Sequence, residues 1–170
     1  NNFYVFSKFY FSYIIFLNNR HILNYKDSFI MILIVDYQAS NLNSIINILK
    51  KINVSFKLSE SEKDFEDCEK IILPGVSNFS YCMKSLKSKN YDKLLKKQVL
   101  ENKKKILGIC SGMQVLGTFS EEGESEGLNL VKGKIKKLPN QKCPNIPHIG
   151  WNKVIFNKNN LMKDIKNFSR

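Results

Sequence analysis

The sequence predicts an α/β fold in which a doubly wound sheet carries helices on both faces. Short apolar runs typical of buried parallel strands alternate with stretches whose apolar residues recur at helical spacing. A chain of 170 residues with 43% hydrophobic content can also form one compact domain around its own core. Together these observations predict the strand and helix alternation of a doubly wound sheet.

The first half of the predicted domain alternates strands and helices. Residues 31–35 form a continuous apolar run, rich in β-branched residues, that ends at Asp36, as expected of a strand covered on both faces. Asn41 can cap the helix that follows, whose apolar residues are Leu42, Ile45, Ile46 and Leu49. The next expected elements are strands at 54–58 and 70–73 around a short acidic turn or helix at 63–68, then helices at 79–86 and 91–102.

The pattern changes after a fourth predicted strand at 106–109. A helix is expected next, with Met113, Val115, Leu116 and Phe119 as its apolar residues, followed by an acidic, glycine-bearing loop at 120–127. Beyond the loop lie short strand-like pieces at 130–131, 135, 138 and 153–156. We expect these pieces to form hairpins added to the sheet.

The charge of the chain favours a lysine-rich surface over a nucleic-acid site. The net charge of +12 arises from 27 basic and 15 acidic residues, but Arg20 and Arg170 are the only arginines. Proteins that read bases and phosphates generally use the planar, bidentate guanidinium of arginine. We therefore expect no nucleic-acid partner.

The four cysteines predict free thiols. Cys68, Cys82, Cys110 and Cys143 include no CxxC pair, and His21 and His148 are the only histidines that could complete a metal site. Cysteines spaced this widely are also unlike the dense framework of small disulfide-bonded proteins. The sequence therefore predicts no metal site and no cofactor. It also predicts a reducing, cytoplasmic location.

The first thirty residues are expected to be upstream or extraneous sequence. Residues 3–17 form an aromatic-rich apolar run, but a helix that spans a bilayer needs about 20 such residues. The basic start and small-residue cleavage site of a secretory signal are missing, so no stable membrane insertion is expected. The first methionine is Met31, at the start of the first predicted strand, so we place the domain at 31–170. A membrane anchor, or an ordered element that docks a partner, is the alternative for residues 1–30.

Cys110 stands where a strand ends and a helix begins, with Gly108 and Gly112 beside it. This is the arrangement of a nucleophile elbow, in which a sharp turn exposes the sulfur near a helix N-terminus. Backbone N–H groups there can stabilise a thiolate and a tetrahedral oxyanion. The alternative is a buried cysteine between two chance glycines.

Five motifs in order give this chain a resemblance to a known family. They are the segments 31–37 with 41–42, 72–76, 108–114, 120–122 with 126–128, and 147–152. Together they resemble the glutaminase subunits of imidazole glycerol phosphate synthase, which are class I glutamine amidotransferases. The resemblance covers 31–170 and implies the flavodoxin-like, doubly wound mixed sheet of that class.

The resemblance implies a covalent mechanism centred on Cys110. The cysteine would attack the side-chain amide of glutamine, form a glutamyl thioester and release ammonia. Gly75, Val76 and Ser77 match the oxyanion strand of the family. Turning one of the amides of this strand toward the developing oxyanion would switch the enzyme on.

Further matched residues would bind the substrate and the partner. Gln114 and Glu122 match positions that hold glutamine, and a carboxylate suits the α-ammonium group; their ordinary alternatives are a solvated helix residue and a loop acid. His148, Trp151 and Asn152 match the surface that faces a (β/α)8 cyclase, where a tryptophan suits an interface. The alternative for Trp151 is a place in the core.

The resemblance also implies that the chain is C-terminally incomplete. We do not expect His148 to be the base for Cys110, because the family's catalytic histidine and glutamate lie after the 147–152 motif, and no such segment precedes Arg170. The chain alone is then expected to be inactive. The family function would be to supply ammonia to the cyclase, in a heterodimer, for histidine biosynthesis. A paralogue that feeds sugar modification for surface polysaccharides, or a truncated non-catalytic subunit, is the alternative.

Three departures from the family pattern lie close to the predicted site. Residues 38–40 read Gln-Ala-Ser where Gly-Met-Gly is usual, which removes backbone freedom from a loop near the active site. Ser77 replaces a common glycine, and Ser111 replaces an apolar residue of the elbow. If position 77 needs positive φ, the serine there would be strained and the switch to the active state would shift.

Overall fold

A five-stranded sheet forms the centre of the protein, in a computed structural model that describes residues 14–16 and 31–137. The strand order is β1-β5-β4-β2-β3. The parallel strands are β2 (Ile32–Ile34), β3 (Phe56–Leu58), β4 (Lys70–Leu73) and β5 (Lys105–Ile109). β1 (Ile14–Phe16) pairs antiparallel with the free edge of β5. The sheet is therefore mixed, but its antiparallel strand comes from residues 14–16, outside the domain that was placed at 31–170.

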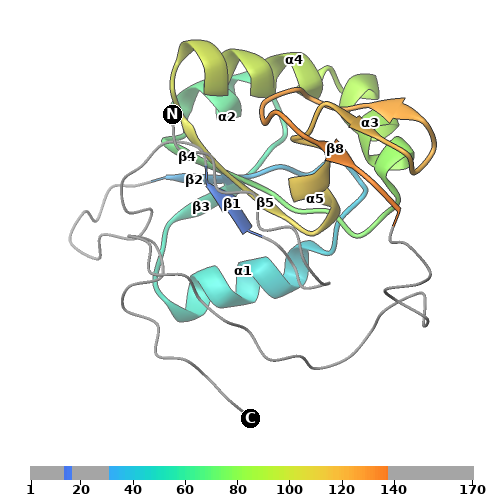
Figure 1. Ribbon diagram of the computed structural model, residues 1–170. Coiled ribbons are helices and arrows are strands. Elements are labelled where there is room, and N and C mark those ends of the chain that lie inside the picture. The colour runs from blue at the N-terminus through green and yellow to red at the C-terminus, as the bar shows by residue number, and fades with distance from the viewer. Residues whose placement is uncertain (1–13, 17–30, 138–170) are drawn as a thin grey trace, which may run out of the picture. The chain divides into compact units, whose positions relative to one another are not determined.

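Helices cover both faces of the parallel strands (Figure 1). One face carries α1 (Leu42–Lys51), and the other carries α2 (Glu62–Asp67), α3 (Phe79–Ser88) and α4 (Tyr91–Lys96). α4 continues directly into a π-helical turn, η1 (Lys97–Glu101). The helices expected at 79–86 and 91–102 are thus confirmed, and the short acidic segment is a helix rather than a plain turn, although it ends at Asp67.

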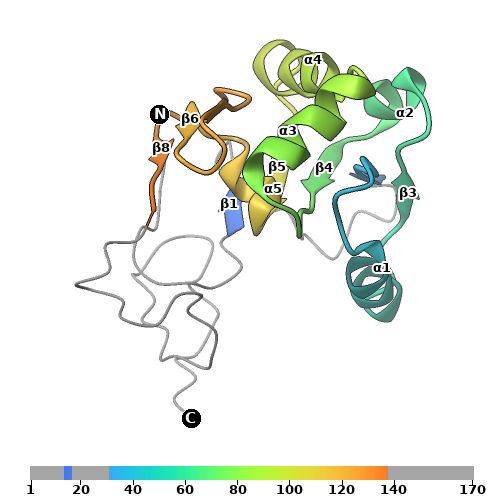
Figure 2. The same cartoon turned by 90° about the vertical axis from the view of Figure 1, so that its right-hand side faces the viewer.

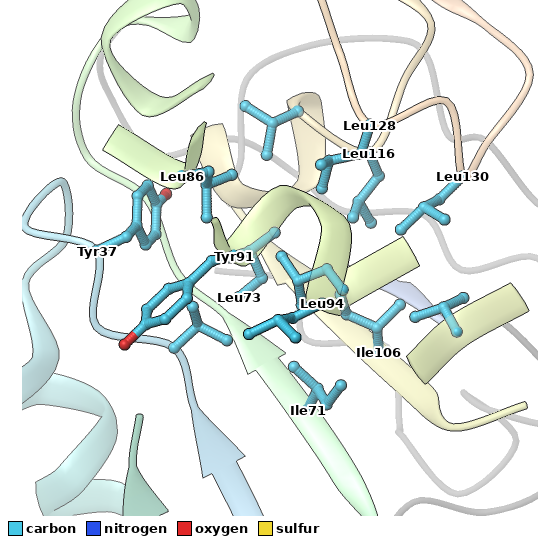
Figure 3. Close-up of a cluster of buried hydrophobic side chains, with 14 of the residues drawn as sticks. Tyr37, Ile71, Leu73, Leu86, Tyr91, Leu94, Ile106, Leu116, Leu128 and Leu130 are labelled. Atoms are coloured by element: carbon cyan, nitrogen blue, oxygen red, sulfur yellow. The ribbon is translucent and has the colours of Figure 1, made fainter. Parts of the chain in front are cut away.

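The core has two layers because alternate residues of the strands face opposite sides of the sheet. Leu33 and Ile71 belong to the larger layer, which includes buried residues of α2, α3 and α4. Figure 3 shows part of this layer, with Ile71 and Leu73 of β4 beside Leu86, Tyr91 and Leu94. Ile34 and Ile72 belong to the smaller layer with Leu49 of α1. Near-continuous apolar strands are what a sheet covered on both faces requires, so the strand at 31–35 was correctly predicted from its composition.

The helix after Cys110 is shorter than predicted. α5 spans only Ser111–Gln114, whereas the periodicity of the sequence extended the helix as far as Phe119. The amide of Leu116 donates to the Met113 carbonyl at 3.1 Å, and the amide of Gly117 donates to the Gln114 carbonyl at 2.9 Å. Bonds with this three-residue spacing tighten the last turn and end the helix. The apolar residues that follow are buried in the core as a turn.

The strand pieces after α5 form a separate sheet, so the expectation that they extend the main sheet is wrong. β6 (Phe119–Ser120) pairs antiparallel with β7 (Ser125–Glu126) and parallel with β8 (Lys134–Ile135). The outer edge of β5 is already occupied by β1, which leaves these short pieces no place there. Leu130 and Val131 are buried in the core without forming a strand, and the pieces predicted at 138 and 153–156 lie outside the described residues.

Candidate functional site

Cys110 occupies a sharp turn between β5 and α5. Its backbone has φ 55° and ψ −122°, in the region with positive φ that residues with a side chain rarely adopt. The Cys110 carbonyl accepts hydrogen bonds from the amides of Met113 (3.0 Å) and Gln114 (3.2 Å), which start α5. The side chain is exposed, so the alternative of a buried cysteine is wrong. This strained turn has the geometry of a nucleophile elbow.

Three glycines allow the elbow to pack against the end of β4. A Cβ on Gly112 would overlap the carbonyl oxygen of Leu73, and one on Gly75 would overlap the amide nitrogen of Gly112. A Cβ on Gly108 would lie 2.5 Å from the Cα of Met113. The glycines are therefore required by close approach of backbones and do not stand beside the cysteine by chance. Contacts of α5 with both β5 and α3 hold this arrangement together (Figure 2).

The segment of residues 74–77, which joins β4 to α3, is held by residues that follow β2. The Tyr37 hydroxyl donates to the Pro74 carbonyl at 2.5 Å, and the Val76 amide donates to the Ala39 carbonyl at 2.9 Å. Tyr37 is fully buried. Burial first, and then the nearby thiol of Cys82, raise the pKa of the Tyr37 hydroxyl well above its usual value. Tyr37 therefore remains a protonated donor at neutral pH.

Two of the departures noted in the sequence are bonded to each other. The hydroxyl of Ser111, in α5, donates to the carbonyl of Ser77 at 2.6 Å. Ser77 is not among the described residues with positive φ, so it carries none of the strain that was considered for it. Gln38 does carry such strain, with φ 62°, at a position where the family commonly has glycine. The loss of backbone freedom was thus correctly expected at residue 38.

The sequence did not predict the bonds that surround the 74–77 segment. The contribution of Tyr37 could have been suspected, because it belongs to the first matched motif. The bonds of Ala39 and Ser111 could not be predicted, because they depend on which backbone segments, far apart in the sequence, come together in the fold. Gly75, Val76 and Ser77, by contrast, lie next to the elbow as expected.

Glu122 lies at the start of α3. Its carboxylate accepts a hydrogen bond from the amide of Phe79 at 2.9 Å, and its own amide donates to the Ser120 hydroxyl at 3.0 Å. A carboxylate at this position satisfies a free N–H of the helix and interacts favourably with its dipole. Gln114 is half-buried at the end of α5. The structure thus connects Glu122 to the residues just after the 74–77 segment.

The remaining candidate residues divide into buried thiols and positions outside the described ranges. Burial raises the pKa of the Cys68 and Cys82 thiols, which makes both poor nucleophiles at neutral pH. His148, Trp151, Asn152 and Cys143 lie outside the described residues. Residues 31–137 contain no histidine, so no imidazole from this part of the chain can serve Cys110.

The described part of the chain offers neither a metal site nor a membrane-spanning helix. Within residues 14–16 and 31–137, no three His, Cys, Asp or Glu side chains gather in a group that could hold a metal ion. No helix in these ranges is long and apolar enough to cross a membrane.

Comparison with known proteins identifies the class of this protein. Residues 31–145 match the model of the CobB/CobQ-like glutamine amidotransferase domain. This match covers more than half of the chain and includes the elbow and the 74–77 segment. The chain therefore belongs to the glutamine amidotransferase family, and the resemblance drawn from its motifs is confirmed.

Among curated proteins, the chain is similar to the imidazole glycerol phosphate synthase subunit HisH. It is 45% identical over 118 residues to HisH of Prochlorococcus marinus, covering 69% of this chain and 55% of that protein. It is 40% identical over 141 residues to HisH 1 of Campylobacter jejuni, covering 82% and 70% respectively. The chain thus spans between about half and about two thirds of the length of these relatives.

Proposed function

We propose that this protein is the glutaminase subunit of an imidazole glycerol phosphate synthase. It would hydrolyse glutamine to glutamate and ammonia. The ammonia would pass to a (β/α)8 cyclase subunit that makes imidazole glycerol phosphate and aminoimidazole carboxamide ribotide for histidine biosynthesis in the cytoplasm. The observation that carries the proposal is the exposed Cys110 on a strained turn at the N-terminus of α5. The similarity to HisH proteins supports the choice of pathway.

The chemistry begins with the sulfur of Cys110. The thiolate attacks the amide carbon of glutamine, a C–S bond forms, and the carbonyl electron pair moves onto oxygen. Collapse of this intermediate breaks the C–N bond; the departing nitrogen takes up a proton and leaves as ammonia. Water then attacks the thioester carbon, the C–S bond breaks, and glutamate and the free thiol are restored.

The oxyanion needs backbone donors close to Cys110. The amide of Ser111, directly after the nucleophile, is one candidate in an elbow of this kind, and an amide of the 74–77 segment is the other. In the structure the Val76 amide is bonded to the Ala39 carbonyl. This amide must therefore exchange its partner before it can donate to an oxyanion.

Two further side chains would hold the substrate. The Gln114 side chain, at the C-terminal end of α5, offers amide donors and an acceptor. Glu122 offers a carboxylate for the α-ammonium group, in competition with the Phe79 amide that it now accepts from. His148, Trp151 and Asn152 would face the cyclase, as the match to the family implies.

A base for the thiol of Cys110 is not supplied by residues 31–137, which have no histidine. General-base assistance commonly contributes a factor of about 100 to 10,000. We therefore expect the base to come from outside residues 31–137. A non-catalytic subunit is the second candidate function, and this same observation favours it.

A covalent probe tests the proposed site without requiring turnover. The chain is incubated with a chloromethyl ketone analogue of glutamine, and the adduct is located by peptide mass spectrometry. We expect one adduct on Cys110 that excess glutamine suppresses and excess asparagine does not. Cys110→Ala should remove the adduct, and Cys68→Ala, which changes a buried thiol, should retain it. An adduct insensitive to glutamine would contradict a glutaminase site and support the non-catalytic alternative.

The cyclase partner requires a separate measurement. The chain is mixed with the cyclase encoded in the same organism, and the complex is detected by analytical ultracentrifugation. We expect a one-to-one complex that Cys110→Ala still forms, because that residue lies in the substrate site. Trp151→Ala should weaken it. The absence of a complex with wild-type protein would contradict the proposed partner.

A further inference from the structure

The bond between Ser111 and Ser77 connects the nucleophile elbow directly to the 74–77 segment. The Ser111 side chain is in the first turn of α5, next to Cys110, and the residue is only 7% exposed. Its hydroxyl donates to the Ser77 carbonyl at 2.6 Å, a short distance for a neutral O–H···O bond. The Cys82 thiol is a second, weaker donor to the same carbonyl at 3.6 Å.

The 74–77 segment is held by hydroxyl groups at both of its ends. At the start, the buried Tyr37 hydroxyl donates to Pro74; at the end, the Ser111 hydroxyl donates to Ser77. Between them, the peptide that joins Gly75 to Val76 is held by one bond, from the Val76 amide to Ala39. Val76 is 66% exposed, so packing of its side chain adds little to this restraint.

From this arrangement we infer that Ser111 is a positioning residue. Its hydroxyl restrains the 74–77 segment in the state in which the Val76 amide is bonded to Ala39 and is therefore withheld from an oxyanion at Cys110. The Pro74 and Ser77 carbonyls are both held by hydrogen bonds. The peptide between Gly75 and Val76 can therefore rotate only between two fixed ends. The catalytic consequence of this inference rests on the proposed function, whereas the restraint itself does not.

The hydroxyl also explains why a polar residue is tolerated at a buried position of the elbow. A buried hydroxyl without a partner is costly, but the Ser77 carbonyl satisfies this one. An apolar residue at 111 would remove the donor and leave the carbonyl with the weak thiol contact. The bond uses the main-chain carbonyl of residue 77, so it depends on the serine at 111 and not on the side chain at 77.

Amide hydrogen exchange tests the restraint. Ser111→Ala should make the Val76 amide exchange roughly three- to tenfold faster, as expected for the loss of one hydrogen bond. Ser111→Thr, which keeps the hydroxyl, should restore slow exchange. Ser88→Ala is the matched control, because the Ser88 hydroxyl donates to a backbone carbonyl at 2.9 Å in α3, outside the segment. Unchanged exchange of Val76 in Ser111→Ala would overturn the inference.

Two thiol reagents distinguish positioning from a general loosening of the elbow. Iodoacetamide alkylates a thiolate by displacement and forms no oxyanion, whereas the chloromethyl ketone analogue has a carbonyl that can become one. In Ser111→Ala we expect the ratio of the ketone rate to the iodoacetamide rate at Cys110 to rise a few fold. Equal changes in both rates would overturn the positioning role. Failure of the wild-type chain to react with the ketone would refute the proposed function, while hydrogen exchange would still decide whether Ser111 restrains the segment.

Discussion

The backbone of Gly112 lies so close to Leu73 that a Cβ on the glycine would overlap the Leu73 carbonyl oxygen and come within 2.7 Å of its carbonyl carbon. Leu73 ends β4, and Gly112 lies in the first turn of α5. The elbow and the adjacent strand are thus packed backbone against backbone. Since both partners are main chain, neither can move aside as a flexible side chain would.

We predict that Gly112→Ala destabilises the protein by about 3 kcal/mol, the upper range for overpacking a well-filled site. The measurement is urea unfolding followed by circular dichroism. Gly133→Ala is the matched control, because a Cβ there would meet nothing within 4 Å, and its effect should stay within about 0.5 kcal/mol. Equal stability of the two variants would show that the elbow can relax around an added methyl group.

The thiols of the described residues should differ sharply in reactivity. Cys110 is exposed, while Cys68 and Cys82 are buried. Burial raises the pKa of both buried thiols and also shields them from reagent. We predict that iodoacetamide at neutral pH labels Cys110 at least tenfold faster than Cys68 or Cys82, as measured by peptide mass spectrometry over time. Denaturation should remove the difference, and rapid labelling of Cys68 in the folded chain would contradict the packing of α2.

Asp64 should make the stability of the protein depend on pH. Its carboxylate forms an ion pair with Lys57 and accepts hydrogen bonds from the amides of Glu60 (2.9 Å) and Ser61 (2.7 Å). The bond with Lys57, followed by the bond from Glu60, holds the pKa of Asp64 well below its usual range. Because the folded pKa lies below the unfolded value of about 3.9, this contribution is present above that pH and is lost as the pH falls toward the folded pKa.

The variant Asp64→Asn keeps an oxygen that can accept the amide bonds but removes the charge, so it is predicted to lower stability at pH 7 by about 1–2 kcal/mol through loss of the ion pair with Lys57 and weakening of those bonds. The difference from wild type should shrink as the pH is lowered from 5 to 3, in urea unfolding measured at each pH. Asp67→Asn, an exposed change in the same helix, is the control and should alter stability by less than about 0.5 kcal/mol. A difference that does not vary with pH would contradict the role assigned to the Asp64 charge.

The parallel strands and the longer helices could be predicted because each is indicated by the spacing of apolar residues within its own segment. The apolar run at 31–35 and the periodic apolar residues of α1 indicate directly which residues pack against the core. The length of α5 and the place of β6, β7 and β8 depended instead on residues far apart in the sequence: a Cβ at Gly117 would lie 3.0 Å from the Gly133 carbonyl oxygen, and β6 pairs with β8. Periodicity carries no information on either.

Only the part of the candidate site that depends on neighbouring residues could be predicted from the sequence. The position of Cys110 after a strand and between glycines is a local signal, and the strained turn was found there. The bonds from Tyr37, Ala39 and Ser111 to the 74–77 segment join residues that are 34 to 37 positions apart. Which donor meets which carbonyl is decided by tertiary packing, so the pairing of Ser111 with Ser77 could be described only from the structure.

Glu122 offers a test that separates substrate binding from helix capping. In the structure its carboxylate accepts from the Phe79 amide at the start of α3. Glu122→Gln keeps a carbonyl oxygen that can accept this bond but removes the charge, so stability should fall by less than about 1 kcal/mol. If the carboxylate also receives the α-ammonium group of glutamine, the loss of a charge-assisted bond should weaken glutamine binding by roughly tenfold or more.

The measurement is the concentration of glutamine that protects Cys110 from the chloromethyl ketone analogue, compared with the unfolding free energy of the same variant. Glu121→Gln is the matched control: Glu121 precedes Glu122, and its carboxylate also accepts from a backbone amide, that of Lys137, at 2.8 Å. We expect the protecting concentration to rise in Glu122→Gln and to stay unchanged in Glu121→Gln. Loss of stability without loss of protection would mean that Glu122 serves α3 alone, and the ammonium group would then need another acceptor.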